Sequence, residues 1–169
     1  MISVAVVGPE STGKTTLTQS LSAYYSAVWV QEYAREYLTD LDGPYDQSDL
    51  LSIAAGQIKS LNESAKKANG LLLQDTDLMV IKIWSEVKYG DVNPWIQMQL
   101  ELNLPDYYFL TFYDIPYEED PLRESPKTRP ELFDIYKKEV KKTGVPYTIL
   151  KGSHRGRLAN AIRIINTIL

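Results

Sequence analysis

One short motif near the N-terminus constrains this chain more than any other feature. Residues 8–15 read Gly-Pro-Glu-Ser-Thr-Gly-Lys-Thr, which fits the phosphate-binding pattern G-x-x-x-x-G-K-[ST]. A β-branched apolar run over 2–7 precedes the motif, and Leu17, Leu21 and Tyr24 follow it at helical spacing. The alternative is a glycine-rich turn without a ligand. The order of strand, loop and helix favours phosphate binding.

The motif gives each of its residues a chemical task. Successive backbone N–H groups of such a loop form a nest for phosphate oxygens, and the following helix adds the positive end of its dipole. The glycines let the backbone approach the ligand, Lys14 reaches the β- and γ-phosphates, and the Thr15 hydroxyl ligates Mg²⁺. We therefore expect a P-loop protein with ATP and Mg²⁺ as cofactors. The expected ATP contacts are Gly8, Glu10, Ser11, Thr12, Gly13, Lys14, Thr15 and Thr16.

Composition narrows the function further. The length of 169 residues suits one domain, and we expect residues 1–169 to form a single one. The net charge of −4, without a basic stripe, argues against a nucleic-acid-processing ATPase or an anionic-membrane surface. The chain contains no cysteine, which excludes thiol catalysis. Its apolar N-terminal run is too short for a signal peptide or a membrane span, so we expect a cytoplasmic protein.

Hydrophobic patterning predicts an α/β fold with five strands. Strands are expected at 2–7, 27–30, 71–74, 107–112 and 147–150, and helices at 16–25, 33–38, 46–68, 78–88, 94–102, 131–142 and 157–169. This alternation implies a parallel sheet with helices on both faces. The polar, proline-broken stretch 113–129 is expected to form a surface loop or lid. Ligands of such sheets bind at the carboxyl ends of the strands, where five loops converge.

Two aspartates follow the third predicted strand. Asp75 comes directly after an apolar run, where P-loop proteins carry the acid that holds Mg²⁺. The alternative is that Asp75 caps the next helix. Asp77 can provide that cap instead. Asp77 is open to capping or to a role toward substrate or metal. We expect Thr15 and Asp75 to form the metal site.

Glu32 and Arg35 follow the second strand at the same edge of the sheet. A carboxylate at position 32 can accept the proton of an attacking hydroxyl, hold a sugar diol, or simply pair with Arg35 one helical turn on. Arg35 can touch the transferring phosphoryl group, or merely pair with Glu32 or Glu36. The sequence leaves these alternatives open, together with the choice of Glu32 or Asp77 as general base.

The lid and the last loop add cationic and titratable candidates. The lid contains Arg123, Lys127 and Arg129, and cations on such a loop suit stabilisation of a phosphoryl-transfer transition state, with Arg123 the best candidate. The alternative is a solvated loop whose cations balance neighbouring acids. His154, the only histidine, falls in the loop expected over 151–156, near the adenine or in solvent rather than in catalysis.

Several of these segments together resemble one family. They are residues 8–15, Glu-Tyr-Ala-Arg-Glu-Tyr at 32–37, Asp-Thr-Asp at 75–77, Asp-Pro-Leu-Arg at 120–123 and Gly-Val-Pro-Tyr at 144–147. The combination resembles the ribosylnicotinamide kinase domain of NadR-type proteins and the wider set of NadR-like AAA-type ATPases. The resemblance runs over essentially the whole chain. Its Glu-Tyr-x-Arg-Glu segment is far more specific than the P-loop, which many NTPases share.

The resemblance implies a nucleoside- or nucleotide-kinase-like fold and an ATP- and Mg²⁺-dependent kinase. Its acceptor would be the 5′-hydroxyl of nicotinamide riboside, in NAD salvage, so the expected partner is a nucleoside-like small molecule. The residues that the resemblance assigns to catalysis are Lys14, Glu32, Arg35, Asp77 and Arg123. In bifunctional NadR proteins a Trp often directly precedes the Glu of the second segment. Here that position is Gln31, and Trp29 lies two residues earlier on the same strand face.

A second interpretation is a nucleotide-dependent regulatory ATPase, or switch, that acts on a protein partner. The predicted lid and the acids opposite the P-loop favour the kinase, because a switch does not need them. The sequence does not indicate the oligomeric state.

Overall fold

The computed structural model describes residues 1–120 and 128–169, and a five-stranded sheet forms its centre. Every neighbouring pair of strands is parallel, in the spatial order β2-β3-β1-β4-β5. The strands are β1 (Ile2–Val7), β2 (Val28–Val30), β3 (Leu71–Asp75), β4 (Tyr107–Thr111) and β5 (Tyr147–Leu150). The sheet confirms the predicted α/β fold and places β1, which leads into the P-loop, at its centre.

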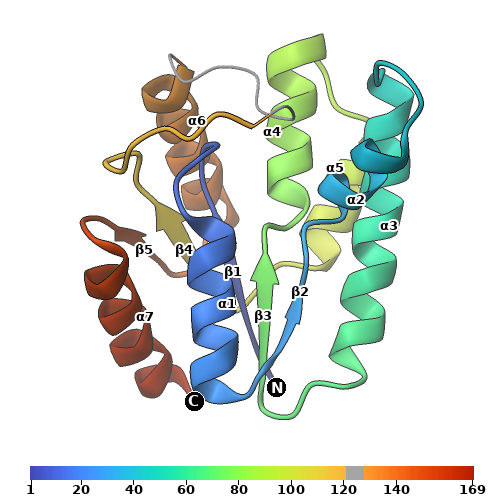
Figure 1. Ribbon diagram of the computed structural model, residues 1–169. Helices are drawn as coiled ribbons and strands as arrows, with labels where there is room; N and C mark the ends of the chain where they lie inside the picture. The colour runs from blue at the N-terminus through green and yellow to red at the C-terminus, as the bar shows by residue number, and fades with distance from the viewer. Residues whose placement is uncertain (121–127) are drawn as a thin grey trace.

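Helices cover both faces of this sheet (Figure 1). They are α1 (Lys14–Tyr25), α2 (Tyr33–Asp40), α3 (Gln47–Ala65), α4 (Leu78–Tyr89), α5 (Pro94–Leu102), α6 (Arg129–Thr143) and α7 (His154–Ile168). Alternate residues of β1 enter two different cores. Val4 and Val6 pack in the cluster with α1 and α7, whereas Ala5 and Val7 pack in the cluster with α3 to α6. Burial on both faces explains the uninterrupted apolar sequence of β1. No helix of the described ranges is long and apolar enough to cross a membrane.

Strand register brings the predicted site residues to one edge of the sheet. Val6 lies opposite Asp75 in the β1–β3 pair, and the next N–H, of Thr76, donates to the Val6 carbonyl over 3.1 Å. Val30 lies opposite Gln74 in the β2–β3 pair, so Glu32 leaves β2 at the same edge. The P-loop, Glu32 and Asp75 therefore meet at the carboxyl edge, as such sheets require.

The last helix begins earlier than predicted. Helix α7 starts at His154 rather than 157, because Ser153 caps it: the Ser153 hydroxyl oxygen accepts the N–H of Gly156 over 3.2 Å. The loop between β5 and α7 therefore covers 151–153 rather than the predicted 151–156. The sequence carried this signal, since Ser is a preferred N-cap residue.

Two further boundaries differ from the prediction. Helix α6 begins at Arg129, the last residue of the predicted lid, with Pro130 in its first turn, where the missing proline N–H costs nothing. Helix α3 ends at Ala65 rather than at 68. There the N–H groups of Lys67 and Ala68 both turn back to the Ser64 carbonyl at 3.0 Å, which tightens the chain out of the helix.

A buried lysine joins α4 to α6. Lys82 is 6 % exposed, and its Nζ lies 2.8 Å from Glu86 Oε1 on its own helix and 2.9 Å from Glu139 Oε2 on α6. We predict that Lys82→Ala costs about 3 kcal/mol of unfolding free energy, because it removes the buried cation that Glu86 and the partly buried Glu139 share. Denaturant unfolding measures this cost. The control Lys142→Ala removes an exposed partner of Glu139 and should cost less than about 1 kcal/mol. Equal costs for the two variants would contradict the account.

Candidate active site

The P-loop backbone adopts the conformation that its glycines were predicted to allow. Gly13 and Ser11 have positive φ angles of 79° and 53°, and Gly8 has φ 146°. A Cβ added at Gly8 would lie 2.5 Å from Thr111 Oγ1 and 2.8 Å from the Thr111 carbonyl oxygen. Position 8 therefore requires glycine for both conformation and close approach to β4. Helix α1 follows with no side-chain cap at its N-terminus, so its first amides face the loop cavity.

Hydrogen bonds within the motif fix its shape. The Thr12 hydroxyl contacts the Pro9 carbonyl and the Thr111 hydroxyl, each at 2.7 Å. The Lys14 Nζ donates to the carbonyls of Gly8 (3.0 Å) and Pro9 (2.8 Å), so the lysine side chain folds over the loop. The predicted phosphate lysine is thus positioned at the mouth of the nest.

Two arginines far along the sequence hold the P-loop carbonyls. Arg157, at 3 % exposure, donates from Nη1 to the Thr12 carbonyl (2.7 Å), from Nε to the Gly152 carbonyl (2.9 Å) and from Nη2 to the Phe112 carbonyl (2.9 Å). It also pairs with Asp114. Arg129 donates from Nη1 to the Ser11 carbonyl over 3.1 Å. Sequence reasoning missed Arg157, because no local pattern marks a residue that acts across the fold.

Asp75 and Thr15 form a pair suited to Mg²⁺. Asp75 is 2 % exposed, and its Oδ1 has no hydrogen-bond partner within the described residues. Burial raises the pKa of Asp75 to about 6 and Glu32 adds to the rise, while a hydrogen bond from Thr15 and the cations Lys14 and Arg35 lower it. A buried, unpartnered carboxylate oxygen beside a hydroxyl is a hard oxygen donor set, so these residues fit a magnesium ion.

Asp77 is turned away from the site. Its Oδ1 accepts the N–H of Met79 over 3.0 Å, which caps α4, and its Oδ2 accepts the Tyr108 hydroxyl over 2.6 Å. Burial raises its pKa to about 6, against the lowering effect of these hydrogen bonds. Asp77 lines neither cavity described below. The structure thus gives Asp77 the capping role that the sequence offered, and its role toward a nucleoside stays a prediction.

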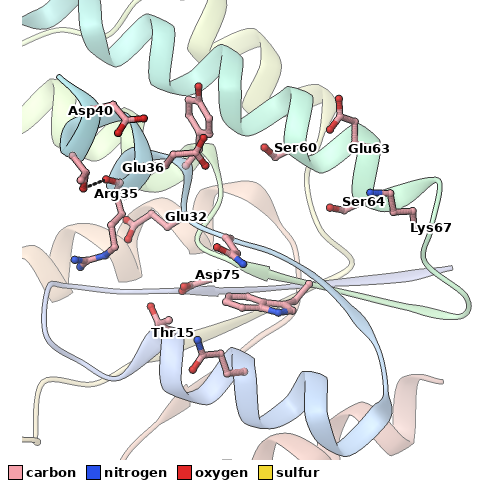
Figure 2. A pocket seen from close by; sticks show the side chains of 15 residues that line it. Thr15, Glu32, Arg35, Glu36, Asp40, Ser60, Glu63, Ser64, Lys67 and Asp75 are labelled. Carbon is pink, nitrogen blue, oxygen red and sulfur yellow. Dashed lines mark hydrogen bonds between the residues drawn. The ribbon is translucent and has the colours of Figure 1, made fainter.

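A groove of about 730 Å³ opens from Thr15 and Asp75 along the edge strand β2 (Figure 2). Thr15, Asp75 and Glu32 lie near one another at one end, and Glu63 of α3 and Lys67, just after that helix, lie at the other. Trp29 and Gln31 of β2 also line it. Carboxylates outnumber cations: the acids are Glu32, Glu36, Asp40, Glu63 and Asp75, and the cations are Arg35 and Lys67. The groove therefore favours a positively charged or hydrogen-bonding ligand.

A second cavity, which we call the cleft, has a volume of about 450 Å³ and begins at the P-loop. Its remaining wall comes from α2, α4, α6 and the segment after β4. Thr15, Glu32 and Arg35 line both the cleft and the groove, so the two cavities meet at these residues.

Arg35 and His154 have contacts that the sequence did not indicate. Arg35 pairs with Asp120, at 3.0 Å, rather than with Glu32 or Glu36, and its side chain is 53 % exposed. His154 is exposed at the start of α7, with its Nε2 3.1 Å from the Ser20 hydroxyl on α1, and it lines neither cavity. Arg123 and Lys127 lie outside the described residues.

The fold and the loop geometry define a P-loop nucleotide-binding domain. A family model described as an AAA domain matches residues 3–157, and the chain belongs to that AAA-domain family. It is 24 % identical over 173 residues to the trifunctional NAD biosynthesis/regulator protein NadR of Salmonella typhimurium. The matched region covers 98 % of this chain and 42 % of NadR. The chain thus spans less than half the length of this relative, and the resemblance to NadR that the motifs suggested is confirmed.

Solved structures show the same fold. Two crystal structures of NadR, one with NAD and AMP-PNP and one with NR, each give a TM-score of 0.76 at 22 % and 23 % identity. Each match covers 98 % of this chain, and 49 % and 51 % of the NadR chains. Deoxyadenosine kinase from M. mycoides, in complex with dCMP and dCDP, gives a TM-score of 0.71 at 15 % identity, over 98 % of this chain and all of that one. The kinase-like P-loop fold is therefore established.

The role of Arg157 is testable. We predict that Arg157→Met lowers the unfolding free energy by about 3 kcal/mol and weakens binding of an ATP analogue at least about tenfold, because the P-loop carbonyl of Thr12 loses its buried donor. Denaturant unfolding and calorimetric titration measure the two effects. The exposed Arg163, which donates a hydrogen bond to Asn160 on its own helix, provides the control Arg163→Met. Wild-type nucleotide affinity in a folded Arg157→Met would show that the anchor is unnecessary.

Proposed function

We propose that this protein is an ATP- and Mg²⁺-dependent kinase that phosphorylates the 5′-hydroxyl of nicotinamide riboside. One observation carries the proposal: Thr15, Asp75 and Glu32 converge where the P-loop cavity meets the acidic groove. Phosphoryl transfer needs a phosphate cradle, a metal site and a base at one point, because catalysis rests on positioning and electrostatics.

The P-loop residues hold the donor. Backbone amides of the nest and of the α1 N-terminus bind the phosphate oxygens, and Lys14 exchanges its carbonyl contacts for the β- and γ-phosphates. Thr15 and Asp75 hold Mg²⁺, which neutralises phosphate charge when it is bound. The unpartnered Oδ1 of Asp75 supports this assignment.

Glu32 is the general base of this proposal. It lines both cavities, whereas the carboxylate of the competing candidate, Asp77, already accepts two hydrogen bonds and caps α4. Glu32 accepts the proton of the acceptor hydroxyl, whose oxygen then attacks the γ-phosphorus. Arg35 stands beside the same point and orients the acceptor. Arg123 remains our candidate for a lid cation, on the strength of the sequence alone.

The groove supports a cationic acceptor. Nicotinamide riboside carries a fixed positive charge on its pyridinium ring, and the carboxylates of the groove outnumber its cations. Trp29 lines the same groove and offers an aromatic face of the kind that binds cations. The crystal structure of the relative NadR with NR adds to this support.

The kinase assignment rests on Lys14. We predict that Lys14→Ala keeps the fold and lowers turnover by about 100-fold or more, because phosphate charge is no longer neutralised. A coupled ADP-release assay with nicotinamide riboside measures turnover, and circular dichroism checks the fold. Lys66→Ala, an exposed change at the end of α3, is the control and should keep full activity. Near-normal turnover in Lys14→Ala, or hydrolysis that no small molecule stimulates, would refute the kinase.

The metal assignment is tested separately. We predict that Asp75→Asn raises the Mg²⁺ concentration for half-maximal activity by about tenfold or more, since an amide is a poorer ligand than a carboxylate. The measurement is a magnesium titration at saturating ATP. Asp134→Asn, at an exposed position of α6, should leave the titration unchanged. An unshifted magnesium dependence in Asp75→Asn would remove Asp75 from the metal site.

A further inference from the structure

The cleft extends well beyond what phosphate binding requires. Past the P-loop its wall includes the apolar side chains of Leu38 from α2, Val80 and Trp84 from α4, and Leu132 from α6, together with the charged Lys88 and Glu118. Its volume of about 450 Å³ falls within the range of small-molecule sites. An apolar wall next to a phosphate nest is the composition of a site for a ring-bearing molecule whose polar end faces the phosphates.

One polar side chain of the cleft has no partner among the described residues. Tyr136 lines the cleft and is 5 % exposed, and its hydroxyl forms no hydrogen bond within residues 1–120 and 128–169. Burial raises the pKa of this phenol, and the carboxylates of Glu32, Asp77 and Glu10 add to the rise. The hydroxyl therefore stays protonated and is ready to donate. The Tyr108 hydroxyl, by contrast, already donates a hydrogen bond to Asp77 Oδ2. Because this hydroxyl belongs to a residue that lines the cleft and has no partner among the described residues, it is available to a ligand bound there.

The cleft and the groove differ in the charge they accept. The groove has five carboxylates against two cations, whereas the cleft has three carboxylates and three cations and, between α4 and α6, the apolar side chains of Val80, Trp84 and Leu132. A ring with a fixed charge loses its hydration in an apolar wall without compensation, but an uncharged ring does not. Both cavities reach Glu32. One reacting point can therefore serve two classes of acceptor.

We propose that the cleft binds an uncharged nucleoside as a second class of acceptor, with its ring between α4 and α6 and its sugar against Tyr136 and Glu32. The inference rests on the proposed phosphoryl transfer at the P-loop. The nucleoside hydroxyl gives its proton to Glu32, and its oxygen forms a bond to the γ-phosphorus. The bond from the γ-phosphorus to the bridging oxygen breaks, and ADP leaves with that electron pair.

The test measures ADP release by the full chain with nicotinamide riboside and, separately, with adenosine, guanosine, cytidine, uridine and thymidine. We expect turnover with at least one uncharged nucleoside. Leu132→Lys, which puts a charge in the cleft wall, should lower kcat/KM for that nucleoside at least about tenfold. It should leave the value for nicotinamide riboside within about twofold, since Leu132 does not line the groove. Glu63→Gln, at the far end of the groove, should produce the reverse pattern.

Tyr136→Phe provides an isosteric second variant. Loss of the hydroxyl should lower kcat/KM for the uncharged nucleoside about tenfold while the protein keeps its melting temperature, because the phenol has no protein partner to lose. A salt titration of the unmodified protein needs no variant. Added salt should raise KM for nicotinamide riboside more than KM for the uncharged nucleoside, because only the former is attracted by charge.

The outcomes separate the two proposals. Turnover of nicotinamide riboside with none of the uncharged nucleosides would overturn the cleft inference and keep the proposed function. Equal sensitivity of both acceptors to Leu132→Lys and Glu63→Gln would also overturn it, because the acceptors would then share one site. If an uncharged nucleoside is phosphorylated and nicotinamide riboside is not, the cleft inference is supported and nicotinamide riboside is excluded as the acceptor. No turnover with any acceptor would overturn both.

Discussion

The P-loop backbone must leave its N–H groups free for phosphate while its carbonyls stay satisfied, and the rest of the site depends on this constraint. Donors from outside the loop meet it. Arg157 on α7 holds the Thr12 carbonyl, and Arg129 at the start of α6 holds the Ser11 carbonyl. With the carbonyls held outward, the amides face the cavity as a nest for anions. The same two arginines bring the segments after β4 and β5 against the loop, since they also bind the carbonyls of Ile115 and Gly152.

The parallel sheet then determines which acids meet the phosphates. Because β3 is the neighbour of β1, Asp75 leaves the sheet next to the P-loop, and β2 on its other side delivers Glu32. Burial raises the pKa of Asp75, a cost that a bound cation would offset. An acidic groove and a partly apolar cleft extend from this one centre. In the function proposed here, charge neutralisation, proton acceptance and acceptor selection would occupy adjacent places with different polarity.

The sequence predicted those parts of the site that are marked by a motif or by a pattern of neighbouring residues. The P-loop has a dense motif, the strands are short apolar runs, and Asp75 sits at the end of one of them, so pattern and position suffice. Ser153 also had a local signal, as an N-cap residue, which a reading based on apolar spacing overlooked. The roles of Glu32 in catalysis and of Asp75 in metal binding remain predictions.

Contacts between distant segments lay beyond sequence reasoning. The sequence offers Arg35 a contact with the phosphoryl group or a pair with Glu32 or Glu36, yet its partner in the structure is Asp120, 85 residues away. The sequence does not decide whether Asp77 caps a helix or faces substrate or metal. In the structure its second carboxylate oxygen accepts a hydrogen bond from Tyr108 on β4. Arg157 reaches the Thr12 carbonyl across 145 residues, with no periodic signal in the chain. Strand order and side-chain direction decide such contacts, and a single sequence specifies them only through the whole fold.

The most direct measurement is a phosphorus NMR spectrum of the purified protein mixed with ATP, Mg²⁺ and nicotinamide riboside. The account predicts a new phosphomonoester resonance that grows with the resonances of ADP, because the γ-phosphoryl group moves to a sugar hydroxyl. A spectrum in which inorganic phosphate alone accumulates with ADP would contradict it. The same convergence of Lys14, Thr15, Asp75 and Glu32 would then belong to an ATPase.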